Sequence, residues 1–268
     1  MWLFAEDFSY KDLSFEKYND QIFGSSNFDY SYLFNTDFSR SNVESSSFDQ
    51  TIIEQTSFIQ ANLIGSRFNN CLITESYFIN SDMEKIRFNN CFLKNVKADS
   101  IKFNNAEVVG LTTYNTSFFG NNFEGTIFQN SRFQNTQFSW SNMRETRFSS
   151  DQNKYLVFNN VEFEHVDFKK SILSNLTIDN SSFDFSDLSG AELADSKIIN
   201  SSFNYTNLLG SNFQNTILIK PAFKKTNVSG VNFKEATYRD GTLFWRVSLE
   251  WLAKEGAVWD EENPPIVN

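Results

Sequence analysis

The chain of 268 residues is poor in proline, cysteine and histidine, with three, two and one of these residues. So few cysteine and histidine residues provide neither a disulfide framework nor a metal-ligand pattern. The sequence contains no glycine-rich phosphate loop and no recognisable arrangement of a nucleophile with a base. We therefore expect no cofactor, no metal ion and no enzymatic activity.

Positive charge is also in short supply, because 23 lysine and arginine residues face 33 acidic residues and leave a net charge of -10. This balance disfavours nucleic acid and anionic membranes as partners. No apolar run is long enough to cross a membrane. Glu6 and Asp7 interrupt the start of the chain before the apolar region of a secretory signal can form, so the cytoplasm is the expected location.

Phenylalanine is abundant, and it recurs with a period of five. Every fifth residue from Leu3 to Tyr238 gives 48 positions, which hold 24 of the 31 phenylalanines. Apart from Ala98, Thr113 and Asn153, the other positions hold Leu, Ile, Val, Met or Tyr. Neither a helix nor an ordinary strand has this period. It predicts a chain that turns a corner every five residues and points a large apolar group inward each time.

The residues around each centre fit such a chain. Two residues before a centre the side chain is usually small, as expected where a large neighbour fills a close-packed interior. Two residues after a centre, Gly or Asn occupies 21 of the 48 positions. Both residues tolerate the left-handed backbone that a tight corner needs.

A longer period of 20 residues lies above the period of five. The segment Arg67-Phe68-Asn69-Asn70-Cys71 recurs as Arg87-Phe88-Asn89-Asn90-Cys91. Twenty residues are four pentapeptides, which predicts four sides per turn with like residues stacked in columns. Cys71 and Cys91 share one column and are expected to be small core residues, whereas His165 is expected at an outward corner.

Segments such as Ser26-Asn27-Phe28-Asp29-Tyr30 and Ala61-Asn62-Leu63-Ile64-Gly65 resemble the repeat A-(D/N)-L-x-x of the pentapeptide-repeat family. The resemblance covers roughly residues 3–240. It implies an all-β fold, a right-handed quadrilateral β-helix of about twelve coils. At about 4.8 Å per coil, the rod would be roughly 57 Å long.

The ends of a solenoid need caps, and this divides the chain into three parts. Residues 1–20 are expected to be an irregular N-terminal cap, because Glu6, Lys11 and Glu16 occupy positions that should be small and buried. Residues 21–240 are the expected β-helix, and residues 241–268 the C-terminal part.

Within this C-terminal part, residues 243–255 read as a capping helix. Its apolar side chains form two stripes, of which one would cover the last coil and the other would support a homodimer. The alternative is that both stripes fold onto the rod. The residues are Phe244, Trp245, Val247, Leu249, Trp251 and Leu252.

Two stretches depart from the repeat. Thr113 stands at a centre within residues 107–114, and Asn153 stands at a centre within residues 151–154. An unpaired buried polar group is costly, so we expect a bulge or a surface loop in each stretch. The alternative is an unbroken coil with hydrogen-bonded polar groups.

Sorting the residues by 20 also separates the charges. One side, built on Leu63, Met83 and Phe103, is expected to be acidic and to form a candidate binding face. Its acidic residues are Asp82, Glu84, Glu124, Glu145, Glu162, Glu164 and Asp184. An adjacent side is expected to lean basic, through Arg67, Arg87, Arg147, Lys169 and Lys170. The alternative is a mixed, solvated surface.

The resemblance suggests a non-enzymatic binding protein. The chain is similar to Qnr- and MfpA-type members, acidic rods whose likeness implies a DNA mimic that binds and modulates or protects a type II topoisomerase such as DNA gyrase. The alternative is a regulatory adaptor, scaffold or effector that binds another protein through one face or the C-terminal end. A carbohydrate-processing β-helix is excluded, since such enzymes need paired carboxylates at a defined spacing.

Overall fold

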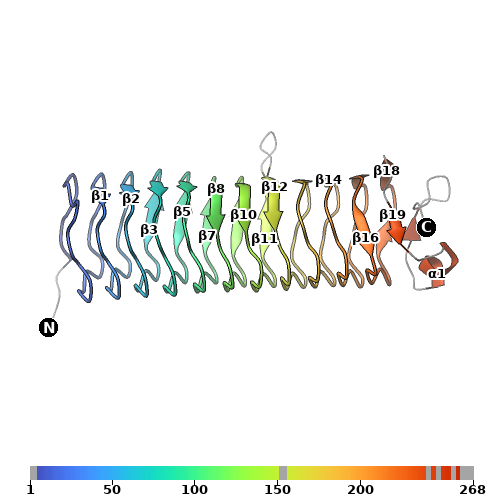
Figure 1. The fold of residues 1–268 in the computed structure, drawn as a ribbon, viewed down its shortest axis with the longest axis horizontal. Coiled ribbons are helices and arrows are strands. Elements are labelled where there is room, and N and C mark those ends of the chain that lie inside the picture. Colours follow the sequence, from blue (N-terminus) through green and yellow to red (C-terminus); the bar gives the residue numbers. More distant parts are fainter. Residues whose placement is uncertain (1–4, 151–155, 240–242, 246–248, 255–257, 260–268) are drawn as a thin grey trace.

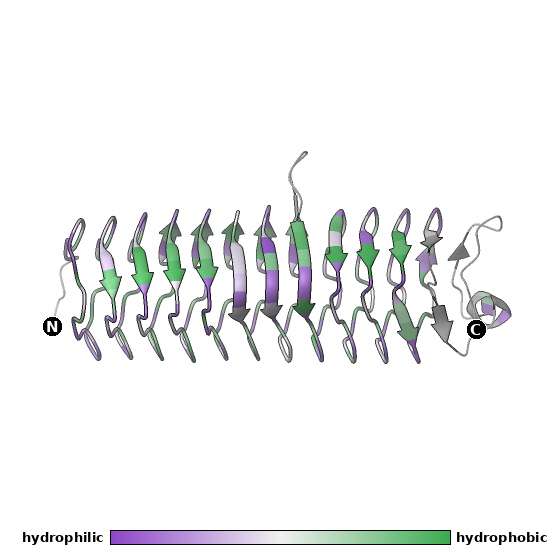
Figure 2. Cartoon of the chain, turned by 45° about the horizontal axis from the view of Figure 1, so that its top comes forward, coloured by the Kyte–Doolittle hydropathy of each residue, from purple (hydrophilic) through white to green (hydrophobic). Residues whose placement is uncertain are grey.

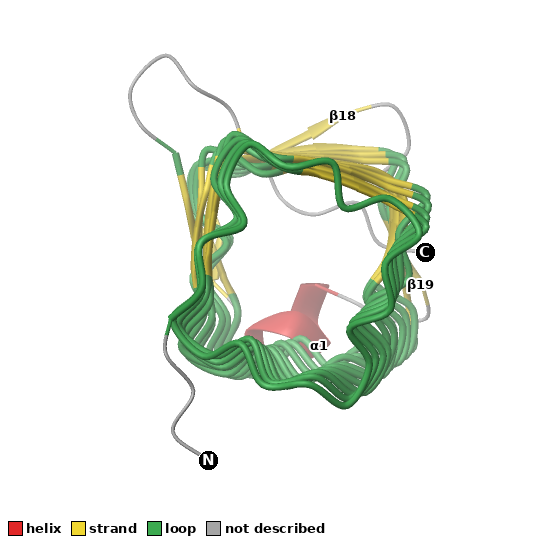
Figure 3. Ribbon diagram, turned by 90° about the vertical axis from the view of Figure 1, so that its left-hand side faces the viewer, coloured by secondary structure: helices red, strands yellow, loops and turns green. Residues whose placement is uncertain are grey.

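The computed structural model describes residues 5–150, 156–239, 243–245, 249–254 and 258–259. These residues form an all-β parallel solenoid that extends as a long rod, with the two ends of the chain at opposite tips (Figure 1). Seen along the rod, the coils superpose on a four-sided outline (Figure 3). The expected solenoid is therefore confirmed.

The strands are short and pair only in parallel within the described residues. An eleven-stranded sheet contains β1 (Tyr32–Phe34), β2 (Ile52–Glu54), β4 (Leu72–Thr74), β6 (Phe92–Lys94), β8 (Thr112–Ser117), β10 (Arg132–Gln137), β12 (Leu156–Glu162), β13 (Leu176–Asp179), β14 (Lys197–Ile199), β15 (Ile217–Ile219) and β18 (Thr237–Arg239). A five-stranded sheet contains β3 (Arg67–Asn69), β5 (Arg87–Asn89), β7 (Glu107–Val109), β9 (Ile127–Gln129) and β11 (Arg147–Ser149).

We name the four sides after the buried residues of one coil: the Phe28 side, the Leu33 side, the Phe38 side and the Val43 side. The five-stranded sheet lies on the Phe28 side and the eleven-stranded sheet on the Leu33 side. The other two sides are joined mostly by isolated parallel bridges. Figure 2 shows apolar and polar residues alternating along the strands, as expected for walls with one buried face.

Each corner is made by one residue with a left-handed backbone. Every fifth residue from Tyr10 to Glu145, and again from Asn160 to Glu235, has φ between 47° and 69°. Asn and Gly tolerate this conformation well, but it is uncommon for large side chains. Trp140 (φ 63°) and Phe185 (φ 61°) nevertheless stand at corners.

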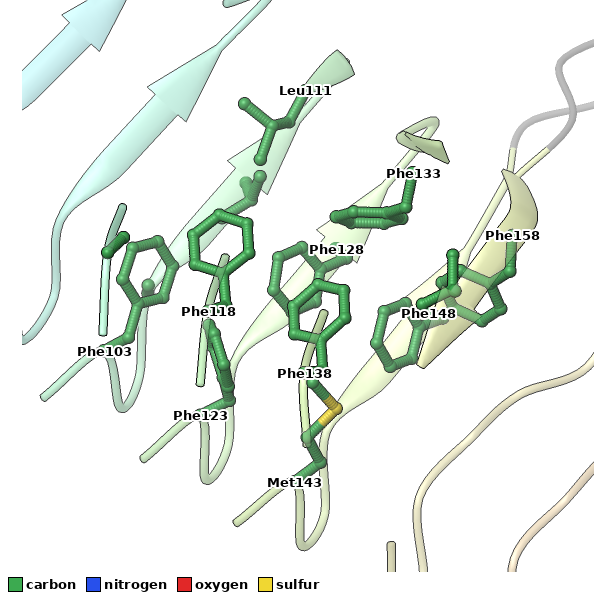
Figure 4. Close-up of a cluster of buried hydrophobic side chains, with 14 of the residues drawn as sticks. Phe103, Leu111, Phe118, Phe123, Phe128, Phe133, Phe138, Met143, Phe148 and Phe158 are labelled. Carbon is green, nitrogen blue, oxygen red and sulfur yellow. The ribbon is translucent and has the colours of Figure 1, made fainter. Parts of the chain in front are cut away.

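The interior is a set of aromatic columns. Phe28, Phe48 and Phe68 are fully buried, and neighbouring rings stack with centroids 4.8 and 4.7 Å apart. Further along the rod, phenylalanines of successive coils again fill the interior (Figure 4). The small buried residues donate to the preceding coil: the Thr51 hydroxyl to the Phe28 carbonyl at 2.9 Å, and the Ser66 hydroxyl to that of Val43 at 2.8 Å. Most polar groups in the wall are thereby satisfied.

The offset between paired coils changes once. Arg132 pairs with Thr112, 20 residues earlier, but with Val157, 25 residues later. Five additional residues therefore lie between β11 and β12. Because five is one pentapeptide, the period of five is unchanged, while every column continues one position later than a strict period of 20 predicts. The loop expected at residues 151–154 lies outside the described residues.

The loop or bulge expected at residues 107–114 is wrong. This stretch contains β7 and β8, both paired in register with the coils on either side. Thr113 is buried at its centre, where its hydroxyl bonds that of Thr136 at 2.8 Å. The polar group has a partner, so the coil continues without a bulge.

The two ends differ in regularity. From Asp7 onward the first coil makes parallel bridges to the second, and Glu6, Lys11 and Glu16 are exposed because no earlier coil covers them. At the other end, β19 (Leu243–Trp245) pairs with β16 (Ala222–Lys224), and β20 (Val258–Trp259) with β17 (Asn232–Phe233). The helix α1 spans only Leu249–Lys254. A helix beginning at residue 243 is therefore wrong, because β19 extends the wall instead.

Candidate functional site

The structure divides the predicted acidic face between two sides. Asp82, Glu84 and Glu124 flank Met83 and Phe123 on the Val43 side, and Glu145 stands at its corner. The remaining acidic residues, Glu162, Glu164 and Asp184, lie on the Phe38 side, because β10 pairs Gln137 with Glu162, which in turn bridges Ser182. The five additional residues after β11 are the physical reason for this correction.

The same offset divides the predicted basic side. Arg67, Arg87 and Arg147 lie on the Phe28 side, where Arg147 bridges Ile172. Lys169 and Lys170 flank Phe168, which follows Met143 on the Val43 side. No single side therefore collects the predicted basic residues.

Acidic residues of the Val43 side are paired with cations. Lys102 contacts Asp82 at 2.8 Å, and Lys169 contacts Asp187 at 3.0 Å. The hydrogen bond from each carboxylate raises the pKa of its lysine. Among the described residues no ion pair involves Glu162, Glu164 or Asp184. The Phe38 side therefore presents the more available negative charge.

A ladder of exposed aromatic rings lies along the corner between the Phe38 and Val43 sides. Trp140 stacks on His165 with ring centroids 4.2 Å apart, His165 on Phe185 at 5.1 Å, and Phe185 on Tyr205 at 5.0 Å. The exposed fractions of Trp140, Phe185 and Tyr205 are 61%, 49% and 43%. We call these four residues the outer ladder. His165 is exposed at a corner, as the sequence predicted.

A polar groove follows the opposite edge of the Phe38 side. Its volume is about 500 Å³, and it crosses the six- and seven-residue strands β8, β10 and β12. One wall is an asparagine column, in which Asn115 donates to Asn95 at 2.7 Å and Asn160 to Asn135 at 3.0 Å. The opposite wall is lined by Lys97, Ser117, Gln137 and Glu162. The Phe38 side thus has amides along one edge and aromatic rings along the other.

Sequence reasoning missed the outer ladder, although a signal was present. All four rings stand at corner positions, but the step from Trp140 to His165 is 25 residues rather than 20. A search at a fixed period of 20 assigns Trp140 and His165 to different corners. Polar Asp151 and Asn153 at positions expected to be buried mark where the offset changes.

The two cysteines belong to the interior, as predicted. Both are free and buried, and their sulfurs donate to the carbonyls of Phe48 at 2.8 Å and Phe68 at 3.2 Å. The neighbouring Cys91 sulfur and burial raise the pKa of the Cys71 thiol, so it is protonated at neutral pH. Within the described residues no cluster of His, Cys, Asp or Glu fits a metal ion, and no helix is long and apolar enough to cross a membrane.

The predicted dimer stripes are only partly within reach of the structure. Val247 lies outside the described residues. Phe244 and Trp245 lie in β19, and Leu249, Trp251 and Leu252 lie in α1. Their places in the backbone separate the residues of each predicted stripe between a strand and a helix. The two helical stripes are therefore not formed as predicted.

The solenoid geometry agrees with a match to a known family model. The model described as pentapeptide repeats matches eight copies, at residues 56–95, 114–149 and 196–235. No curated protein sequence matches the chain.

Among solved structures, the chain is similar to HetL, a pentapeptide repeat protein involved in heterocyst differentiation regulation from Nostoc sp. strain PCC 7120. The identity is 14%, the match covers 87% of this chain and 92% of HetL, and the TM-score is 0.34. It is also similar to full-length QnrB1, a plasmid-mediated fluoroquinolone resistance protein, with 14% identity, 86% and 92% coverage, and a TM-score of 0.28. A pentapeptide repeat protein of the Arabidopsis thaliana thylakoid lumen is 18% identical, with 47% and 67% coverage and a TM-score of 0.22.

Proposed function

Because this chain is a pentapeptide-repeat protein, we propose that it is a non-enzymatic rod that binds another protein through its Phe38 side. The observation that carries the proposal is the outer ladder, four exposed rings on a rigid wall beside Glu162, Glu164 and Asp184. Exposed aromatic residues commonly supply most of the binding energy at protein interfaces. Carboxylates beside them favour a partner with a basic surface.

The left-handed corners strengthen this proposal. Large side chains are uncommon in that conformation, so Trp140 and Phe185 are not the residues that corner stability alone would favour. Asparagine or glycine, found at many other corners of this rod, would fit the backbone better. A binding role gives a reason for rings at these positions.

A charge-reversal experiment tests the proposed face, and the divided acidic residues supply its control. One variant combines Glu162→Lys, Glu164→Lys and Asp184→Lys on the Phe38 side. The matched variant combines Asp82→Lys, Glu84→Lys and Glu124→Lys on the Val43 side. Both change the net charge by the same amount. We expect the first set to weaken partner binding by about tenfold or more, and the second by far less. Equal losses would show that only total charge matters.

The more specific candidate partner is a type II topoisomerase, with the rod acting as a DNA mimic. It is favoured by the net charge of -10 and by ten acids against three bases in residues 1–60. The divided acidic face argues against one continuous track of carboxylates. The test measures binding to purified gyrase and topoisomerase IV at low and moderate salt, together with supercoiling activity. Salt-sensitive binding with altered supercoiling supports the candidate, and no binding at either salt rejects it.

The adaptor alternative is favoured by the outer ladder itself, since aromatic anchors suit protein surfaces in general. We propose further that the rod is right-handed, has about twelve coils, and is closed by residues 241–268. Deleting these residues tests whether the C-terminal part binds the partner or joins two copies. Retained partner binding and an unchanged mass by light scattering would assign the interaction to the side of the rod.

A further inference from the structure

The two ends of the outer ladder are finished differently. At the C-terminal end, Lys225 stands at the next corner and places its ammonium group 5.4 Å from the centroid of the Tyr205 ring. A cation over an aromatic face is attracted by the negative face of the ring. The protein itself therefore caps one end of this stack with a positive charge.

At the other end the corner before Trp140 is Gly120. The Gly120 amide donates to the Ser139 carbonyl at 3.0 Å, which places Gly120 one coil before Trp140. A Cβ built on Gly120 would meet only the Ser100 hydroxyl oxygen within 4 Å, at 3.8 Å. One face of Trp140 stacks on His165, while the opposite face has no side chain from the neighbouring corner. Among the described residues no cation lies over this ring.

The surroundings of this open face are suited to a positive group. Glu124 is exposed four residues after Gly120, and Glu164 is exposed one coil beyond Trp140. The nearby Arg144 contacts Asp167 at 3.6 Å, on the side away from Gly120. Neither carboxylate has an ion-pair partner among the described residues. A cation placed above Gly120 would thus meet an aromatic face with carboxylates close by.

We propose that the open face of Trp140 binds the guanidinium group of an arginine on a basic segment of a partner protein. The guest group would occupy the place in the ladder where the corner at Gly120 contributes no side chain. Tryptophan is the aromatic residue that binds cations best, and the flat guanidinium stacks on a ring better than an ammonium does. This proposal rests on the proposed protein-binding function and names the chemistry of its partner.

The experiment measures the binding of an acetylated and amidated hexa-arginine peptide to the full chain at moderate salt, by fluorescence anisotropy. Hexa-lysine and hexa-citrulline are the comparison peptides, since the first keeps the charge and the second keeps the shape. We expect hexa-arginine to bind most tightly, and Trp140→Ala to weaken it by roughly three- to tenfold. In Trp140→Ala the preference for arginine over lysine should disappear.

A second variant supplies the cation within the chain. Gly120→Arg puts a guanidinium at the corner beside Trp140 and should weaken the peptide as Trp140→Ala does. The matched control is Gly210→Arg, since Gly210 also has a left-handed corner backbone (φ +63°) and nothing within 4 Å of an added Cβ. A second control is Tyr205→Ala, whose ring Lys225 already caps. Both controls should change the affinity by less than about twofold.

Two results overturn the proposal: unchanged hexa-arginine binding in Trp140→Ala, or equal weakening by Gly210→Arg and Gly120→Arg. The second result would mean that the peptide responds to net charge alone. Because the peptide is measured directly, this outcome is separate from the search for the protein partner. Peptide binding at Trp140 with no topoisomerase binding would reject that partner and keep the arginine site.

Discussion

The rod contains two aromatic ladders with nearly the same geometry, one inside and one outside. Inside, Phe28, Phe48 and Phe68 stack with centroids 4.7–4.8 Å apart and are not exposed at all. Outside, Phe185 and Tyr205 stack at 5.0 Å, with 49% and 43% of each side chain exposed. The spacing of both ladders follows from the distance between adjacent parallel strands.

The comparison shows that stacking geometry alone does not reveal what a ring does. An inner ring is held by apolar contacts on all sides, so removing it leaves a cavity. An outer ring covers little apolar surface and stands on a backbone that large side chains rarely adopt. We therefore expect inner rings to determine stability and outer rings to determine binding.

The strongest test of this difference is Phe48→Ala. The ring is fully buried between Phe28 and Phe68, so its loss removes contacts with two coils. We expect the free energy of unfolding to fall by about 3–5 kcal/mol, measured by urea denaturation. Phe185→Ala is the matched control at an outer position, with an expected loss below about 1 kcal/mol. Similar losses in the two variants would contradict the comparison.

A polar pair inside the rod sharpens the same comparison. Thr113 interrupts an apolar column, where its hydroxyl bonds that of Thr136, and Thr136 also donates to the Gln134 carbonyl at 3.0 Å. Thr113→Val keeps the shape and leaves Thr136 with the carbonyl. We expect unfolding free energy to change by less than about 1 kcal/mol in either direction. A loss as large as that of Phe48→Ala would show that the hydroxyl pair is structurally essential.

The outer position gives a smaller change when the new residue suits the corner. Phe185→Asn removes a stacked ring but places at φ 61° a residue that tolerates the left-handed conformation. The two effects oppose one another, and we expect the midpoint of thermal unfolding to shift by no more than about 2 °C. Affinity for the protein partner should nevertheless fall. If stability falls while partner binding is kept, the roles assigned to the two ladders are wrong.

Most of the fold was predictable because each pentapeptide repeats the same physical requirement. A large apolar centre, a small inward neighbour and a left-handed corner recur every five residues, so Phe48 or Cys71 can be placed without coordinates. The wall at Thr113 was not predictable in this way. The sequence shows a polar residue at a buried position but not the Thr136 hydroxyl that satisfies it.

The candidate site was harder to predict, for a geometrical reason. Five additional residues do not alter a period of five, so nothing in that period reveals that the columns have moved. The acidic residues before and after the change were therefore assigned to one face, although Glu124 and Glu164 lie on different sides. Only a comparison of side chains between coils, such as Trp140 with His165, contains the offset of 25.

The smallest expected effect concerns the start of the corner column that later carries the outer ladder. There Arg40 forms two hydrogen bonds with Asp20, both 2.7 Å long. The Arg40 side chain lowers the pKa of Asp20 to about 2. In Arg40→Gln, the pKa of Asp20 should rise towards the unperturbed value of about 3.9, as measured by NMR titration of the carboxyl carbon.

The direction of the pH dependence follows from this lowered pKa. A carboxyl group with a lower pKa in the folded state stabilises the fold above its unfolded pKa, and this contribution is lost as pH falls from about 4 towards 2. Both side chains are more than half exposed, so the effect on stability should be small. If Arg40→Gln leaves the Asp20 pKa unchanged, the pair is not formed in solution. The column of corners would then be ordered only where aromatic rings stack, and the contrast between its two ends would be sharper.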